Sequence, residues 1–324
     1  MSQEPRFLRG RLANAAAAPA RAVGPAAQGG RKIRAAGVSI ASNSVLIVLK
    51  IVAGAVTGSI AIITEAVHSA IDLLASVIAF VSVRKADTPA DESHPYGHAK
   101  VENMAAAIEG MLILVGAGII IYESVRRLLD VAPVENLGFG IAVIGFSAAA
   151  NLGVSTYLYR QASATESPAL EADAAHLRTD AATSLGVLLA LVVVETTGVQ
   201  EADPIMALLV AAAIVFAGVR ILSRSSRVLV DEALPAEELE GVRLAIEEAA
   251  PAEVAGFHKL RARRAGSRRY VDLHVQFHEG TTLKRAHEVS HELQTEIRKR
   301  LRSADVLIHL EPEGPPRRKL EDLP

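Results

Sequence analysis

Two histidine–aspartate pairs of equal spacing are the residues best suited to do chemistry in this sequence. His68 precedes Asp72 in the apolar stretch IAIITEAVHSAIDLLASVIAF, and His176 precedes Asp180 in ALEADAAHLRTDAATSLGVLLAL. A spacing of four residues places both side chains on one face of an α-helix, about one turn apart. Two imidazoles and two carboxylates can complete a tetrahedral site for a divalent transition metal. The pairs therefore predict a metal site shared by two helices.

The apolar surroundings of these pairs strengthen that prediction. An aspartate near the centre of a bilayer costs roughly 2.5–3.5 kcal/mol on insertion scales, so a membrane helix seldom carries one without a use. Polar packing is the alternative, because an intramembrane histidine often only hydrogen-bonds to a neighbouring helix, and an aspartate could pair with Lys50 in the preceding apolar segment. The repetition of the pair in two segments favours metal binding. Glu65 and Asp173 lie near the same faces but are left out of the ligand set, because four ligands already suffice.

Six apolar segments are long enough to cross a bilayer and would position the two pairs. They run near residues 36–57, 60–83, 102–124, 137–159, 170–198 and 203–223. The second and fifth segments carry the pairs and are amphipathic, and a plain hydropathy threshold would miss one or two of the six. Lys and Arg gather before the first segment and after the sixth, whereas the short loops 56–60 and 200–203 contain none. This bias predicts that both termini are cytoplasmic.

After Pro235 the hydropathy falls and shorter periodic elements begin. Apolar spacing predicts helices over 236–249 and 282–301, and strands over 254–263, 270–278 and 306–310. The order α-β-β-α-β indicates a compact α+β domain. The chain then divides into a disordered cytoplasmic arm (1–35), an all-α six-helix transmembrane bundle (36–228), a small cytoplasmic domain (229–312) and a disordered tail (313–324).

The arm has an alternative interpretation. Its residues are mostly Ala, Arg, Gly and Pro, and it lacks the apolar core of a secretory signal. An Arg-rich start with few acids could also be an organelle transit peptide. The composition favours a disordered cytoplasmic arm.

The composition also excludes several classes of function. Cysteine is absent, so there is no thiolate metal site and any metal ligands must be His, Asp or Glu. The formal net charge of -2 gives no sign of nucleic-acid binding. The motifs G-x-x-x-x-G-K-[ST] and G-x-S-x-G are absent, so we expect neither an enzyme nor ATP-driven transport. Active transport would have to use an ion gradient.

The loop between the second and third apolar segments contains a second candidate metal site. Asp91, His94 and His98 occur in the run ADESHPYGHAK. An acid and two histidines at this spacing can bind a metal on a loop. The alternative is an ordinary polar loop, in which the Pro-Tyr-Gly insert only makes a turn.

Histidines are also concentrated in the C-terminal domain. Six of the ten in the chain fall there, close to Glu311: His258, His274, His278, His287, His291 and His309. Strand alternation places His274 and His278 on one face, and helical spacing places His287 and His291 on another. A metal site and a set of solvated surface histidines are both compatible with this pattern.

Three runs of the sequence resemble the cation diffusion facilitator family: EAVHSAIDLLAS, DESHPYGHAKVE and EADAAHLRTDAATSLGVLLAL. The resemblance covers roughly residues 36–312 in order. It implies a membrane exporter of divalent metals, typically Zn²⁺, that exchanges them for protons. It also implies a homodimer with six spans per protomer and a ferredoxin-like cytoplasmic domain that binds metal and holds the dimer together.

The resemblance further implies roles for particular residues. The family's transport site matches His68, Asp72, His176 and Asp180, and its loop site matches Asp91, His94 and His98. Its cytoplasmic binuclear site matches His258, His274, His287, His309 and Glu311. A bacterial zinc member has aspartate at the last position, and the extra methylene of Glu311 would shift the geometry of that site. His278 and His291 have no counterpart, and a charge lock between the dimer halves would fall on Lys100 and Asp231.

Ligand chemistry gives the expected transport cycle. Metal binding needs neutral imidazole and ionised carboxylate, so protons and metal compete for the site. The site would load metal from the cytoplasm and release protons, and protons would displace the metal on the other side. We expect an integral protein of the lipid bilayer, in a bacterial inner membrane, that exports Zn²⁺. Fe²⁺, Co²⁺, Mn²⁺ or Ni²⁺ as the ion, and a membrane-bound sensor or scaffold that does not transport, are the alternatives.

Overall fold

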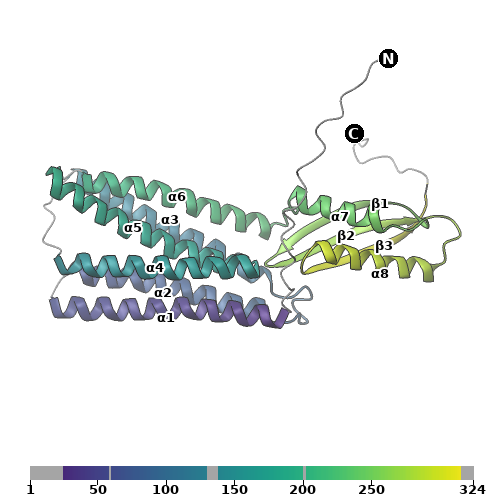
Figure 1. The fold of residues 1–324 in the computed structure, drawn as a ribbon, viewed down its shortest axis with the longest axis horizontal. Coiled ribbons are helices and arrows are strands. Elements are labelled where there is room, and N and C mark those ends of the chain that lie inside the picture. The colour runs from purple at the N-terminus through teal and green to yellow at the C-terminus, as the bar shows by residue number, and fades with distance from the viewer. Residues whose placement is uncertain (1–24, 58–59, 130–137, 200–201, 315–324) are drawn as a thin grey trace, which may run out of the picture.

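The computed structural model describes residues 25–57, 60–129, 138–199 and 202–314. Long helices form a bundle, and a small α+β domain lies at one end of it (Figure 1). The helices of the bundle are α1 (Pro25–Thr57), α2 (Ile60–Ala86), α3 (Lys100–Leu129), α4 (Gly138–Thr165), α5 (Pro168–Thr197) and α6 (Ala202–Leu229). Each of the six predicted apolar segments therefore corresponds to one helix.

Helix α1 begins earlier than the sequence suggested. The predicted arm covers residues 1–35, but α1 starts at Pro25. The cause is tertiary: Lys32 Nζ lies 2.7 Å from Glu102 Oε1 on α3, and Ala35 and Ala36 are fully buried. Residues 1–24 of the arm and 315–324 of the tail lie outside the described residues.

Hydropathy alone selects fewer spans than the six predicted. Within the described residues, the stretches Gln28–Ala53, Lys100–Leu129 and Pro204–Leu229 are long and apolar enough to cross a membrane, which makes three candidates. No described stretch of α2, α4 or α5 is among these three. The six-span arrangement therefore stays a prediction.

The turn between α4 and α5 sets the start of α5. Glu166 adopts a φ of 53°, and Ser167 Oγ accepts the Leu170 N–H at 3.4 Å. Serine is a favoured N-cap residue, and Pro168 in the first helical position has the φ that a helix needs. This start brings Leu170 and Leu177 into the bundle core.

The C-terminal domain has the predicted order of elements. It contains α7 (Ala236–Ala249), β1 (Val254–Ala265), β2 (Arg268–Phe277), α8 (Leu283–Arg300) and β3 (Ala304–Pro312). The sheet order is β1-β2-β3, with β1 antiparallel and β3 parallel to the central strand. The α-β-β-α-β prediction is confirmed, and the strand ends differ by a few residues.

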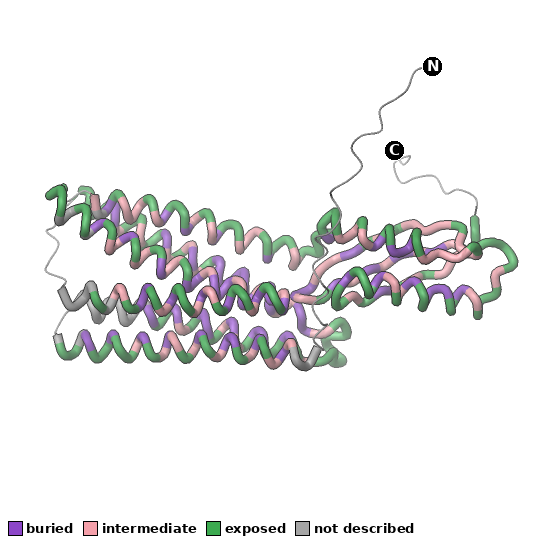
Figure 2. The backbone as a smooth tube through the Cα atoms, in the orientation of Figure 1, coloured by how far each residue is buried: buried purple, intermediate pink, exposed green. Residues whose placement is uncertain are grey.

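The two faces of this sheet have different environments. On β2, Val271, Leu273, Val275 and Phe277 are buried in one core with side chains of α7 and α8, such as Ile246 and Leu293. The alternate residues of β2 point to the opposite, partly open face, as the pleat requires. In Figure 2, buried residues accordingly alternate with intermediate ones along the strands.

Strand register aligns three histidines on the open face. His258 of β1 is opposite His274 of β2, and His274 is opposite His309 of β3. The fold therefore positions these imidazoles as a row across the sheet.

Candidate metal sites

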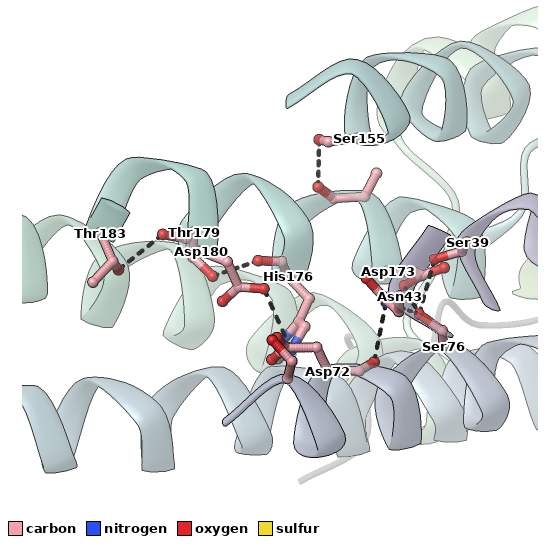
Figure 3. Close-up of polar contacts among 12 residues, drawn as sticks. Ser39, Asn43, Asp72, Ser76, Ser155, Asp173, His176, Thr179, Asp180 and Thr183 are labelled. Atoms are coloured by element: carbon pink, nitrogen blue, oxygen red, sulfur yellow. Dashed lines mark hydrogen bonds and ion pairs between the residues drawn. The ribbon is translucent and has the colours of Figure 1, made fainter. Parts of the chain in front are cut away.

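Three of the four predicted metal ligands in the bundle converge between α2 and α5. His176 Nε2 lies 3.4 Å from Asp72 Oδ1 and 3.9 Å from Asp180 Oδ2. One ligand atom from each of these residues lies within 4.8 Å of the others. Figure 3 shows the two carboxylates and the imidazole turned toward one another. Three converging N and O donors fit a divalent metal that still accepts one more ligand.

Burial separates this site from an ordinary surface cluster. Asp72 is 4% exposed and His176 is 5% exposed. His68 lies in α2, but its side chain is outside the described part of the chain. Its assignment as the fourth ligand stays a prediction.

Hydrogen bonds from neighbouring helices hold the site. Asn43 of α1 donates to the Asp72 backbone oxygen at 3.4 Å and to Ser76 Oγ at 2.8 Å. Ser155 of α4 donates to the Ala174 carbonyl at 2.6 Å and so fixes α5 two residues before His176. Supporting bonds of this kind orient metal ligands and tune their affinity.

The loop residues also converge. Asp91 Oδ1 lies 3.1 Å from His94 Nδ1, and Asp91 Oδ2 lies 3.2 Å from His98 Nε2. The Asp91 carboxylate accepts the Ser93 hydroxyl and the His94 N–H, and these bonds hold the pKa of Asp91 well below its usual range. The turn chemistry and the metal-ligand geometry therefore occur together, and Asp91 is ionised at neutral pH.

The open face of the sheet holds a third cluster. The Glu311 carboxylate accepts hydrogen bonds from His274 Nδ1 at 2.7 Å and from His258 Nε2 at 2.8 Å. These bonds, that from His274 first, lower the pKa of Glu311 to about 2. His309 Nε2 is 3.8 Å from the same carboxylate. The predicted grouping of these four residues therefore occurs within one chain.

His287 does not join that cluster within one chain. It lies on α8, which covers the opposite face of the sheet, so the core separates it from Glu311. Its Nε2 is instead 3.1 Å from Nε2 of His291. His278 directly follows the last residue of β2, and its Nδ1 lies 2.7 Å from Glu313 Oε2. The sequence pattern could not show that His287 faces away from the cluster, because the facing of α8 depends on tertiary packing.

Comparison with known proteins decides the family. Residues 36–230 match the family model of the cation efflux transmembrane domain, and residues 234–313 match the cation efflux protein cytoplasmic domain. The chain belongs to the cation efflux, or cation diffusion facilitator, family.

Several relatives share most of their length with this cation efflux protein. An uncharacterised transporter of Synechocystis, sll1263, is 35% identical over 83% of this chain and 86% of its own. The cation-efflux pump FieF of Shewanella oneidensis is 31% identical over 85% of this chain and 92% of its own. FieF of Klebsiella pneumoniae is 31% identical over 87% of this chain and 93% of its own.

Two solved chains of the candidate zinc transporter CzrB also match. They are 32% and 33% identical, with TM-scores of 0.24 and 0.26. They cover 25% and 27% of this chain and 99% of their own.

In this cation efflux protein, Lys100 and Asp231, the residues of the expected charge lock, pair within one chain. Lys100 Nζ lies 2.7 Å from Asp231 Oδ1, and Arg263 Nη1 lies 2.7 Å from Asp231 Oδ2. The hydrogen bond from Lys100, and then that from Arg263, lowers the pKa of Asp231. The resemblance implied a pair between dimer halves, whereas here it joins α3 to the start of the cytoplasmic domain. Exposed pairs of this kind contribute only about 0–1 kcal/mol.

The sequence did not indicate how the two domains dock. The hairpin tip between β1 and β2 contacts the start of α3, where the Gly266 N–H donates to Asn103 Oδ1 at 2.7 Å. Next to it, Arg269 is 6% exposed and pairs with Glu238 and Glu166, each at 2.6 Å. Glu166 belongs to the α4–α5 turn, so the cytoplasmic sheet is tied to the helix that carries His176. The sequence shows only the run Ala265-Gly266-Ser267 between the two predicted strands, which is typical of a turn.

Proposed function

We propose that this cation efflux protein exports a divalent metal ion, with Zn²⁺ as the preferred substrate, in exchange for protons. The observation that carries the proposal is the convergence of Asp72, His176 and Asp180 inside the bundle, between two different helices. His68, one turn before Asp72 on α2, is proposed as the fourth ligand. Nitrogen and oxygen donors of this kind suit Zn²⁺, and the absence of cysteine argues against soft ions such as Cu⁺.

The exchange follows from what the ligands must release. Zn²⁺ binds ionised carboxylates and neutral imidazole, so a protonated site must lose protons when the metal enters. Facing the cytoplasm, where the docked domain lies, the site takes up metal and gives up protons. Facing outward, protons take the place of the metal. The proton gradient then drives export through alternating access, in an inner membrane that all six helices cross with both termini in the cytoplasm.

Other ions and a role without transport are the competing proposals. The name cation-efflux pump, given to the FieF relatives, supports efflux without selecting an ion. Fe²⁺, Co²⁺, Mn²⁺ and Ni²⁺ therefore belong in the same assay as Zn²⁺. A membrane-bound sensor would bind the same ions and move none of them.

Flux into proteoliposomes with an imposed pH gradient separates these possibilities. We expect Zn²⁺ accumulation that follows the gradient and disappears when an ionophore collapses it. Asp72→Asn supplies a protein of the same size without one of the metal-binding charges. Zn²⁺ binding without gradient-dependent flux would favour the sensor and rule out antiport.

We further propose that the chain is a homodimer held together through its cytoplasmic domain. His287 and His291 lie on the outer side of α8, away from the cluster around Glu311, so only a second copy could bring His287 to that cluster. Metal bound there would favour one geometry of the pair. Light scattering of the full-length protein with and without Zn²⁺ tests this, and a monomer under both conditions would contradict it.

A further inference from the structure

Glu109 of α3 is a buried acid that is not among the proposed metal ligands. It is 0% exposed, and neither of its carboxylate oxygens has a hydrogen-bond partner among the described residues. It also lies in one of the three stretches apolar enough to cross a membrane. Burying an ionised carboxylate without a partner is very unfavourable, so such a group usually keeps its proton.

The helices around Glu109 offer no described cation to pair with it. Helices α2, α5 and α6 pack against α3, and α6 comes so close that a Cβ on Gly110 would lie 3.0 Å from the Leu222 backbone nitrogen. Lys32 is already paired with Glu102, two turns before Glu109 on the same helix. The described Arg and Lys residues of α2, α5 and α6 are exposed: Arg84, Lys85, Arg178, Arg220, Arg224 and Arg227. His176 of α5 is buried, and its Nε2 lies beside Asp72 and Asp180. The surroundings therefore favour a neutral, protonated carboxyl.

A second buried acid lies on α5, which packs against α3. Asp173 is 0% exposed, and its negative charge disfavours ionisation of Glu109. Asp173 Oδ1 accepts the Ser76 hydroxyl at 3.1 Å, while its Oδ2 has no hydrogen-bond partner among the described residues. Two buried carboxylates on helices that pack together cannot both ionise cheaply, so the pair retains a proton unless a positive charge arrives nearby.

A divalent metal at the proposed transport site would bring that charge. Asp173 lies three residues before His176 on α5, which places the two side chains about one turn apart. Asn43 and Ser76 link Asp173 to Asp72 in a chain of hydrogen bonds (Figure 3). Buried charges are weakly screened, so the metal's charge is felt along this chain.

We propose that Glu109 is a proton-binding site of the transport cycle, distinct from the metal ligands. It holds a proton while the transport site is empty and loses it when a divalent cation binds. In that step the carboxyl O–H bond breaks, the proton leaves to water, and the cation supplies the compensating positive charge. The inference rests on the proposed metal–proton exchange and adds to it one proton that does not come from a ligand.

The test is the pH dependence of Zn²⁺ binding to the purified full-length protein. The slope of the logarithm of the affinity against pH equals the number of protons released per metal ion bound. We expect Glu109→Gln to lower that slope by about one proton and to leave Zn²⁺ binding at high pH intact. Glu109→Asp retains a carboxyl and should retain most of the slope. The matched control is Glu171→Gln, because Glu171 is a partly exposed acid of α5 that pairs with Arg224 at 2.7 Å.

The outcomes separate this inference from the proposed function. A wild-type slope of zero would overturn the exchange itself. A positive wild-type slope that Glu109→Gln leaves unchanged would overturn only the role of Glu109. If the glutamine variant does not fold, Glu109→Leu removes the carboxyl while suiting an apolar contact, and the same comparison applies. A purely packing role would change the stability of the protein and leave the slope as it was.

Discussion

Nε2 of His176 on α5 lies 3.4 Å from Oδ1 of Asp72 on α2, although α3 and α4 separate these helices in the sequence. The partner within α5, Asp180, is at 3.9 Å from the same nitrogen. The imidazole is therefore shared by a carboxylate of its own helix and one of a neighbouring helix. A site of this kind changes when the two helices move relative to each other, as alternating access requires.

Removing either carboxylate charge should abolish metal binding in the bundle. We expect Asp72→Asn and Asp180→Asn each to weaken Zn²⁺ binding by more than about 100-fold, since residues that only support a metal ligand already contribute about 10–100-fold. The amide keeps the size of the side chain, so the protein should still insert. Equilibrium binding and proteoliposome flux measure the effect. Wild-type binding in both variants would remove this site from consideration.

His68 should determine ion preference if it completes the site. We expect His68→Ala to weaken Zn²⁺ binding and His68→Asp to widen selectivity, because an oxygen donor is harder than an imidazole nitrogen. Competition between Zn²⁺ and Cd²⁺ in the flux assay measures the preference. The same Zn²⁺/Cd²⁺ ratio in His68→Asp and wild type would argue for a different fourth ligand.

Asn43 should matter although it binds no metal. Its amide donates to Ser76 Oγ at 2.8 Å and to the Asp72 carbonyl at 3.4 Å, and so holds α2 in place beside the site. We expect Asn43→Ala to weaken Zn²⁺ binding by about 10-fold while the protein still folds. Thr156→Ala on α4 is a suitable control, because that hydroxyl bonds only to its own helix, at the Leu152 carbonyl. Equal affinities in the two variants would show that Asn43 only fills space.

Local periodicity explains which parts of this arrangement the sequence could predict. A four-residue spacing places His176 and Asp180 on one helix face wherever the helix lies, and strand alternation separates the core residues of β2 from its histidines. These relationships need no knowledge of neighbours. The number of ligands that a metal requires predicts that α2 and α5 meet, and Asp72, His176 and Asp180 do lie together in the structure.

The features that could not be predicted depend on neighbours far along the chain. Helix α1 begins at Pro25 because Lys32 reaches Glu102, and a Gly-containing stretch gives no local sign of that contact. In the sequence, Glu109 is one polar residue in an apolar segment. Only the packing of α5 against α3 shows that Asp173 acts on it electrostatically. The direction in which His287 points could not be predicted either, because helical spacing does not show which side of α8 packs on the sheet.

The docked hairpin should be sensitive to a single methyl group. Gly266 has a φ of 56°, and an added Cβ would lie 2.6 Å from the Ala99 carbonyl oxygen of the loop before α3. We expect Gly266→Ala to destabilise the junction by about 1–3 kcal/mol and to lower both the unfolding temperature and Zn²⁺ flux. Gly241→Ala in α7, where a Cβ meets nothing within 4 Å, should leave both unchanged or raise stability slightly. Equal unfolding temperatures would contradict the docking.

Glu311 should make the stability of the cytoplasmic domain depend on acid pH. Its pKa is lowered from 4.5 to about 2, chiefly by the hydrogen bond from His274 and then by that from His258. A lowered carboxyl pKa contributes stability that is fully present above the ordinary value and is lost as the pH falls through the lowered one. In EDTA, we therefore expect wild-type stability to fall between pH 4.5 and about 2, with a shallower fall in Glu311→Gln. Denaturant unfolding followed by circular dichroism measures this.

The matched control for that experiment is Glu313→Gln, because Glu313 is exposed and also bonds to a histidine, His278, at 2.7 Å. It should keep the wild-type pH dependence. The same carboxylate of Glu311 joins histidines from β1 and β2 and lies near His309 of β3, so its loss should also weaken Zn²⁺ binding to the cytoplasmic cluster. Binding at the bundle site should be unaffected, since the two sites share no ligand. If Glu311→Gln kept both the acid dependence and the cytoplasmic Zn²⁺, the cluster would be a row of surface histidines and no metal site.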